Sequence, residues 1–238
     1  MNFVITMAGL GLRFKNAGYK EPKMLIKAFN KTLLEWALDS LPLDLSTNLV
    51  FIGLKEHKEI YNLENFIRKK YGKFNPKFLW LDNVTRGQAE TVYKAKNLVD
   101  FDTDLIIYNI DTYFQSKTLK RNLLRNNVDG VLVAFKANDK RYSYAKIDEN
   151  GYILETVEKE VISDYALTGF YHFKYPSDFF EVCEKYIKHN ITIKNEFYIA
   201  PMYNDLIKKG KKFIIDTTEE CWILGTPEEL EYFMKNYK

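Results

Sequence analysis

The 238-residue sequence has only two cysteines, three histidines and no long apolar run. Cys183 and Cys221 are far apart and form no CxxC or Cys/His spacing, which argues against a metal knot or a disulfide framework. No apolar run approaches the roughly 20 residues that cross a bilayer. The N-terminal segment also lacks the pattern of a signal sequence. These absences predict a cytoplasmic protein with no membrane partner.

A strong excess of charge is missing as well. Lys and Arg number 35 against 32 Asp and Glu, and the surplus is spread along the chain. This distribution argues against nucleic acid as a partner. What the chain does have is 46% hydrophobic residues, which is enough for a sizeable core.

Short apolar runs alternate with amphipathic segments in the first half of the chain. Thr32 is a good N-cap for one of these segments. The alternation predicts an α/β fold, a three-layer sandwich with a mainly parallel, mixed sheet between helices. We expect strands at 2–6, 48–54, 77–81 and 104–111, and helices at 32–41, 56–72 and 87–99.

The second half changes character after about residue 139. Two strand-like runs within 142–159 meet at Asn150-Gly151, a strong hairpin signal. This predicts a small antiparallel addition within a single domain over 1–238. We further expect a strand at 165–173, helices at 177–190 and 196–210, a strand at 211–216, and a last helix at 226–237.

A glycine-rich loop, "MAGLGLRFKNAGYKEPKMLI", follows the first strand. Glycines in such a turn let backbone N–H groups approach a phosphate closely. The dinucleotide pattern G-x-G-x-x-G would need glycine where Phe14 stands, and the P-loop pattern would need Gly-Lys where Gly11 is followed by Leu12. The loop therefore predicts a phosphate site of another kind.

The order Gly9-Leu10-Gly11-Leu12-Arg13, then Pro22-Lys23, resembles the signature of the sugar-phosphate nucleotidyltransferases, A-G-x-G-x-R followed by P-K. The alternative is that the glycines only form a tight turn and that Arg13 and Lys23 are solvated surface charges. Later segments of the chain favour the family, since they agree with it in order and spacing. The resemblance implies a Rossmann-like fold of the nucleotidyltransferase type.

Two of these segments belong to the first half. "TRGQAETVYKA" resembles the turn that recognises the nucleotide base, which implies roles for Gly87 and Gln88; the alternative is an ordinary helix start. Asp111 ends a buried apolar strand, where the family has a metal-binding aspartate, and strand carboxyl ends are where ligands bind in open α/β sheets. Its alternative role is to cap the next turn.

Three further segments belong to the second half. "RYSYAKIDENGYILETVEK" resembles the family's acceptor motif, in which the lysine meets the acceptor phosphate and the glutamate meets its polyol. "LTGFYHF" and "NEFYIAPMYNDLIKKG" resemble the T-G-x-Y strand and the N-E-x-Y-L helix. The implied acceptor-binding residues are Glu158, Lys159, Gly169, Glu196 and Tyr198.

The closing segment, "WILGTPEEL", resembles W-x-D-x-G-T-P-E-x-L but departs from it. Ile223 stands where the family commonly has a second metal-binding aspartate, and isoleucine offers no oxygen to a hard cation. Mg2+ would then be held by Asp111, triphosphate oxygens and water. Alternatively, another carboxylate substitutes, with Asp216, Glu219 and Glu220 as the candidates.

The resemblance implies transfer of a nucleotide from an NTP to a phosphorylated metabolite, with release of pyrophosphate. Residues 1–138 would bind the nucleotide and residues 139–238 the acceptor, with Mg2+ as cofactor and a homodimer as a possible assembly. The implied catalytic residues are Arg13, Lys23 and Asp111, with Asp111 as the metal ligand. The implied nucleotide-binding residues are Ala8, Gly9, Gly11, Arg13, Lys23, Gly87 and Gln88.

Departures from the thymidylyl and uridylyl types make the chain more similar to the capsule-associated branch that often transfers cytidylyl groups. CTP is therefore favoured, and the acceptor is a sugar 1-phosphate or a non-sugar phosphate such as phosphoglutamine or phosphocholine. Two other functions stay open. A glycosyltransferase of the related fold would need D-x-D where the chain has Asn109-Ile110-Asp111, and a non-catalytic nucleotide sensor would fit the missing carboxylate at Ile223.

Overall fold

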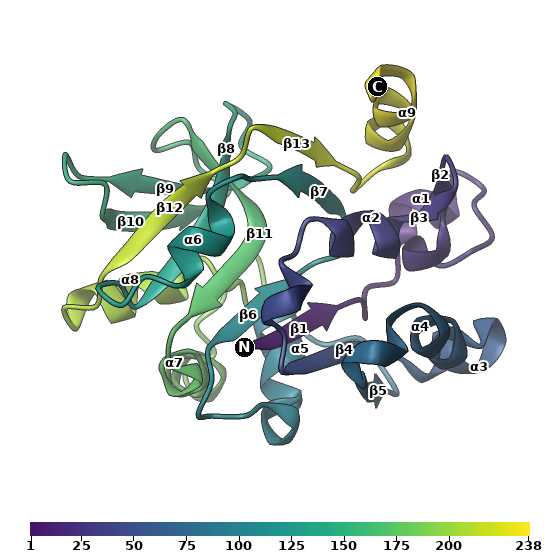
Figure 1. Cartoon of the computed structure of the whole chain (residues 1–238), viewed down its shortest axis with the longest axis horizontal. Coiled ribbons are helices and arrows are strands. Elements are labelled where there is room, and N and C mark those ends of the chain that lie inside the picture. The colour runs from purple at the N-terminus through teal and green to yellow at the C-terminus, as the bar shows by residue number, and fades with distance from the viewer.

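The computed structural model describes all 238 residues and has a mixed nine-stranded sheet at its centre (Figure 1). The order β10-β9-β11-β6-β1-β4-β5 forms its main path, and β8 and β12 continue from β11. The strands are β1 (Asn2–Thr6), β4 (Asn48–Leu54), β5 (Lys77–Leu81), β6 (Leu105–Tyr108), β8 (Gly130–Lys136), β9 (Ser143–Ile147), β10 (Ile153–Glu158), β11 (Tyr165–Phe173) and β12 (Phe213–Thr217).

Helices and two short sheets surround this sheet. The small antiparallel pairs are β2 (Lys27–Ala28) with β3 (Lys31–Thr32), and β7 (Thr112–Gln115) with β13 (Glu220–Ile223). The α-helices are α1 (Leu12–Asn16), α2 (Leu33–Asp39), α3 (Lys55–Tyr61), α4 (Leu63–Tyr71), α5 (Gln88–Lys94), α6 (Leu119–Leu123), α7 (Pro176–Lys188), α8 (Met202–Lys208) and α9 (Pro227–Asn236).

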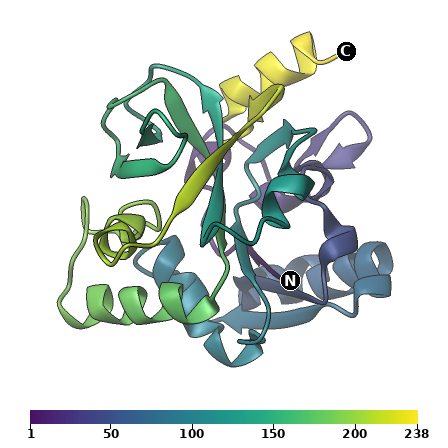
Figure 2. The same cartoon turned by 60° about the vertical axis from the view of Figure 1, so that its left-hand side comes forward.

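The strand directions divide the sheet in two. β1 pairs in parallel with β4 and β6, and β4 pairs in parallel with β5, whereas β11 runs antiparallel to β6, β8 and β9. The hairpin β9–β10 lies at the opposite end of the sheet from β4 and β5 in both views (Figure 1 and Figure 2). The predicted α/β three-layer sandwich with a mixed sheet and a small antiparallel region is confirmed.

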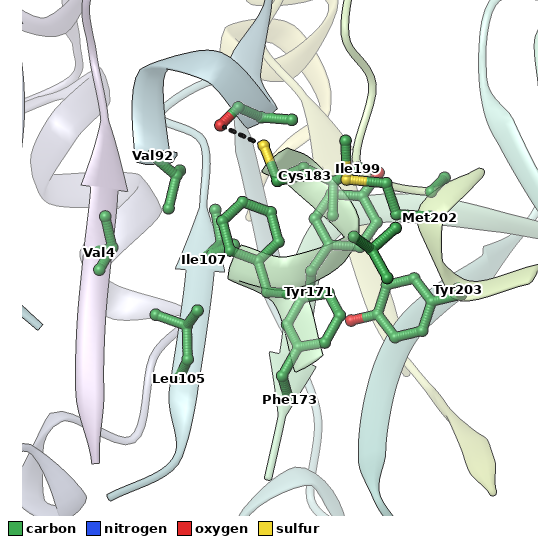
Figure 3. Close-up of a cluster of buried hydrophobic side chains, with 14 of the residues drawn as sticks. Val4, Val92, Leu105, Ile107, Tyr171, Phe173, Cys183, Ile199, Met202 and Tyr203 are labelled. Carbon is green, nitrogen blue, oxygen red and sulfur yellow. Dashed lines mark hydrogen bonds between the residues drawn. The ribbon is translucent and has the colours of Figure 1, made fainter. Parts of the chain in front are cut away.

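Alternate strand residues feed two cores, because successive side chains on a strand point to opposite faces. Val4 packs into a core shared with α5, α7 and α8, which Figure 3 shows in close-up, and its neighbours Phe3 and Ile5 pack against α2, α4 and α6 on the other face. Within the first core the thiol of Cys183 donates to the carbonyl oxygen of Ala89 at 3.5 Å. Both cysteines are free thiols.

A third, smaller core joins the two ends of the chain. It packs Leu230 and Phe233 of α9 against Phe14 of α1, Trp36 of α2 and Tyr113 of β7. Figure 1 shows α9 beside the segment that carries α1, β2 and β3. The first and last motifs of the sequence are therefore held next to each other by burial of aromatic surface.

Several predicted elements differ from those observed. The helix expected at 56–72 is two helices, because Asn62 has a left-handed φ of 49° that α-helical geometry does not allow. The helix expected at 196–210 is wrong over its first six residues, and α8 begins at Met202. α5 ends at Lys94 and a 3-10 turn over Lys96–Leu98 follows. The strands β7, β8 and β13 were not expected. None of the helices has the length and apolar character that a membrane span requires.

Replacing Thr32 with alanine tests the start of α2. The Thr32 hydroxyl accepts from the Glu35 N–H at 3.2 Å, and a Glu35 carboxylate oxygen accepts from the Thr32 N–H at 3.0 Å. We expect Thr32→Ala to lower the free energy of unfolding by about 1 kcal/mol in urea denaturation, because a backbone donor loses its partner. Lys69→Ala in α4 is the control. Equal stability of wild type and Thr32→Ala would contradict the role of the cap.

Candidate active site

A cleft of about 620 Å3 lies at the carboxyl ends of β1 and β6. Ligands bind at this edge of open α/β sheets because loops leave the strands there in different directions. The cleft brings together the glycine loop, the turn before α5 and the end of β6. Of the residues expected to act in the site, Gly9, Gly11, Arg13, Lys23, Gly87, Asp111 and Glu196 line it.

The glycine loop forms one wall. Gly11 directly precedes α1. Its φ of 61° lies in the left-handed region, which favours glycine. A Cβ on Gly11 would lie 3.4 Å from the Cβ of Lys23, whereas the space around Gly9 is open. Arg13 is exposed and its guanidinium has no hydrogen-bond partner in the chain. Ala8 is buried behind this wall and does not line the cleft.

Lys23 and Asp111 form an ion pair on the floor of the cleft, with 2.8 Å between Nζ and Oδ2. Their side chains are 15% and 34% exposed, so both charges are accessible to a ligand. Lys23 Nζ also lies 3.5 Å from the carbonyl oxygen of Gly225. A cation and a carboxylate from segments 88 residues apart thus meet at one point.

The turn before α5 is locked to a distant loop. Gly87 has a φ of 125°, and a Cβ there would lie 2.6 Å from the carbonyl oxygen of Phe197. The Phe197 N–H donates to the Arg86 carbonyl at 2.6 Å, and the Ala89 N–H donates to the Phe197 carbonyl at 3.1 Å. This contact brings Glu196 to the cleft. The Gln88 side chain donates to the Thr6 hydroxyl at 3.0 Å and lies outside the cleft lining.

Three further expected acceptor residues, Glu158, Lys159 and Tyr198, lie together outside the cleft lining. Lys159 has a left-handed φ of 61°, and its ammonium contacts the hydroxyl of Tyr198. Glu158 is buried and accepts a hydrogen bond from the Ser143 hydroxyl. Burial raises the pKa of the Glu158 carboxyl, because the charged form loses water.

The other acceptor residue, Gly169, has a φ of 88° and touches the side chain of Asn109. A Cβ on Gly169 would lie 2.2 Å from Asn109 Nδ2, so this contact requires glycine. Asn109 lines the cleft two residues before Asp111, and its Oδ1 is buried with no hydrogen-bond partner. Asn109 was not among the expected site residues. The signal that could have found it is its place at the end of a buried strand, which is the signal that pointed to Asp111.

The structure places no second carboxylate at the expected metal position, which Ile223 occupies. Ile223 pairs with Thr112 across β13 and β7, and the N–H of the next residue, Leu224, donates to the Asp111 carbonyl at 2.7 Å. Ile223 thus lies beside Asp111. No group of three His, Cys, Asp or Glu side chains could hold a metal ion.

The three candidate substitutes form hydrogen bonds elsewhere, and none of them lines the cleft. Asp216 accepts from hydroxyls and an amide on the loop before α6 and on α6 itself. Glu219 accepts from the Lys117 N–H, and Glu220 from the Trp222 indole. The carboxylate of Asp111 remains as a ligand for Mg2+. A single carboxylate fits this ion, which often takes one or two carboxylates and completes its shell with phosphates and water.

Comparison with known proteins identifies the class. Residues 3–225 match the family model "Nucleotidyl transferase", and the chain belongs to this family. A solved structure described as the nucleoside-diphosphate-sugar pyrophosphorylase from Vibrio cholerae RC9 is 32% identical, with a TM-score of 0.83 over 98% of this chain and 100% of the other.

The similarity extends to more distant proteins. The inositol-1-phosphate CTP transferase from T. maritima is 14% identical, with a TM-score of 0.76 over 99% of this chain and 97% of the other. The "Low-salt glycan biosynthesis nucleotidyltransferase Agl11" of Haloferax volcanii is 24% identical over 97% of this chain. The chain spans 64% of the length of this curated relative.

The buried Glu158 predicts a dependence of stability on pH. Its pKa is raised in the folded chain, so the folded state binds a proton more tightly than the unfolded state. The carboxyl therefore destabilises the fold as pH rises above its ordinary value of 4.5, and has no such effect well below it.

We expect Glu158→Gln to raise the free energy of unfolding at pH 7.5 and to change it little at pH 3.5, because the amide resembles the protonated acid. Urea denaturation at both pH values measures this, with exposed Glu155→Gln on β10 as the control. An equal gain at both pH values would contradict the assignment.

Proposed function

We propose that the chain joins the nucleotidyl group of an NTP to a small phosphorylated metabolite and releases pyrophosphate. The observation that carries this proposal is the meeting of Lys23 and Asp111 in a cleft lined by the glycine loop. A cation beside a carboxylate, with an unpaired Arg13 on the same wall, suits a ligand that carries several phosphates and a divalent ion. Membership of the nucleotidyl transferase family supports the reaction class.

In this mechanism an oxygen of the acceptor phosphate attacks the α-phosphorus of the NTP. The new P–O bond forms as the bond to the bridging oxygen of pyrophosphate breaks, and the electron pair leaves with pyrophosphate. The attacking oxygen is already anionic near neutral pH, so no general base is needed. Catalysis then depends on positioning and on neutralising charge.

The chain's residues divide these tasks. Gly9 and Gly11 leave room for the triphosphate against the backbone, and Arg13 binds its outer phosphates. Lys23 offsets the charge at the α-phosphate and on the departing pyrophosphate. Lys159, on the other side, binds the acceptor phosphate and reduces the repulsion between the two anions.

Asp111 would hold Mg2+ together with the triphosphate, and the bound ion would supply charge neutralisation to the phosphate oxygens. In the free chain Asp111 pairs with Lys23. When the nucleotide binds, Lys23 would contact a phosphate and Asp111 would contact the ion, so each charge would keep an opposite partner. A single carboxylate suffices in this arrangement, since the ion arrives with the substrate. This is how the proposal accommodates Ile223.

The finer identity of the substrates is also proposed. CTP is the favoured nucleotide, and the acceptor is a sugar 1-phosphate or a non-sugar phosphate such as phosphocholine or phosphoglutamine. The Haloferax volcanii relative is named for glycan biosynthesis, which is compatible with a role in capsule or surface polysaccharide. We further propose that residues 1–138 bind the nucleotide and 139–238 the acceptor, in a cytoplasmic enzyme that can form a homodimer.

A pyrophosphate-release screen tests the proposal. The four common NTPs are each combined with Mg2+ and with sugar 1-phosphates, phosphocholine and phosphorylated amino acids. We expect turnover with one nucleotide and one acceptor class, and none when EDTA removes the ion. Tight NTP binding without turnover across the panel would instead support a nucleotide sensor, and hydrolysis of nucleotide sugars without pyrophosphate release would support a glycosyltransferase.

Lys23→Ala and Asp111→Ala test the assigned roles. Each removes one charge from the ion pair, and we expect each to lower kcat/KM by about 10² to 10³, or a few kcal/mol of transition-state stabilisation. Asp82→Ala is the control, because Asp82 forms an exposed ion pair with Lys55 outside the cleft. Circular dichroism confirms folding. Turnover equal to wild type in either cleft variant would contradict its role.

A further inference from the structure

The loop 223–226 comprises the last residue of β13 and the three residues before α9, and it brings Gly225 to the cleft beside the ion pair. Leu224 is tied to Asp111 through its N–H, and the Gly225 carbonyl lies 3.5 Å from Lys23 Nζ. A Cβ on Gly225 would lie 3.7 Å from the nearer oxygen of the Asp111 carboxylate. A shift of this loop would therefore move the surroundings of both charges at once.

Glu229 holds this loop from behind. Its Oε2 accepts from the Gly225 N–H at 3.0 Å, and its own N–H donates to the Thr226 hydroxyl at 3.2 Å. Glu229 lies in the first turn of α9, a helix anchored by the third core through Leu230 and Phe233. The loop is thus fixed to a packed helix by one carboxylate.

The second oxygen of the same carboxylate reaches the other half of the chain. Glu229 Oε1 accepts from Arg141 Nη1 at 2.8 Å. Arg141 Nε in turn donates to Asp139 Oδ2 at 2.8 Å, and the Arg141 N–H donates to Asp139 Oδ1 at 2.9 Å. The planar guanidinium therefore connects the loop between β8 and β9 to the loop 223–226 with a fixed geometry.

We propose that Glu229 and Arg141 are positioning residues, which hold Gly225 in place against Lys23 and Asp111. This inference rests on the proposed function. Neither residue is among those that line the cleft, so they act on the ion pair through Gly225. The Arg141 side chain is 53% exposed, and pairs of this kind add little to global stability. Their effect lies in the local order of the loop.

Turnover distinguishes this role from a merely structural one. We expect Glu229→Ala to lower kcat about 10-fold, with a change of less than about threefold in KM for the NTP, because misplaced groups slow the chemical step more than binding. Glu229→Gln keeps an acceptor for the Gly225 N–H and should recover most of the loss. Arg141→Ala, which leaves the Gly225 bond in place, should give a smaller decrease than Glu229→Ala.

Hydrogen exchange measures the same loop without any substrate. In the free protein we expect Glu229→Ala to speed exchange of the amides in 223–226, while exchange in β1 and β6 stays unchanged. The control is Asp205→Ala, which breaks the pair of Lys185 and Asp205. That pair has side-chain exposures of 53% and 19%, close to the 53% and 17% of Arg141 and Glu229, and it lies outside the cleft.

The outcomes separate the two proposals. Wild-type kcat in Glu229→Ala, or unchanged exchange in 223–226, overturns the positioning role. If the wild-type chain releases no pyrophosphate with any pair in the screen, the proposed function fails. The exchange measurement then decides alone whether Glu229 holds the loop, because it needs neither nucleotide nor acceptor.

Discussion

The ion pair between Lys23 and Asp111 is the interaction on which the candidate site depends. Lys23 comes from a loop after the first strand, and Asp111 from the end of β6, which lies next to β1 in the sheet. Neither charge is deeply buried, so the pair costs little desolvation and can exchange partners when a polyanion and a divalent ion arrive. The rest of the structure brings these two groups together and keeps the space beside them open.

Three features of the fold serve this arrangement. The parallel pairing of β1 with β6 places two loops at one edge. The contact between Gly87 and Phe197 brings a loop of the second half to the same edge, and it depends on the absence of a side chain. In the third core, α9 packs against Trp36. This packing fixes the loop before α9, which carries Gly225. Burial of apolar surface thus supports a polar site at a distance from it.

Much of the fold could be read from patterns of residues. β1, β4, β5 and β11 match the predicted ranges, because apolar runs between polar segments are local signals. The helix at 196–210 was only half right, since residues 196–201 are held by contacts with the turn at Gly87 that no local pattern encodes. β7 and β13 were missed for a related reason. Each is four residues long and exists through pairing with the other.

The sequence by itself determined the family motifs, the α/β class and the expectation that Lys23 and Asp111 serve one site. It also showed the missing carboxylate at Ile223, because a motif with one letter changed is visible without coordinates. Only the tertiary structure showed that Asp216, Glu219 and Glu220 form their hydrogen bonds outside the cleft lining and that Asn109 has an unpaired oxygen. It also showed that one carboxylate, that of Glu229, accepts from both Gly225 and Arg141. The physical reason is distance. Hydrogen bonds and ion pairs act over about 3 Å in space. Lys23 and Asp111, like Arg141 and Glu229, are 88 positions apart in sequence and share no local pattern that fixes their separation.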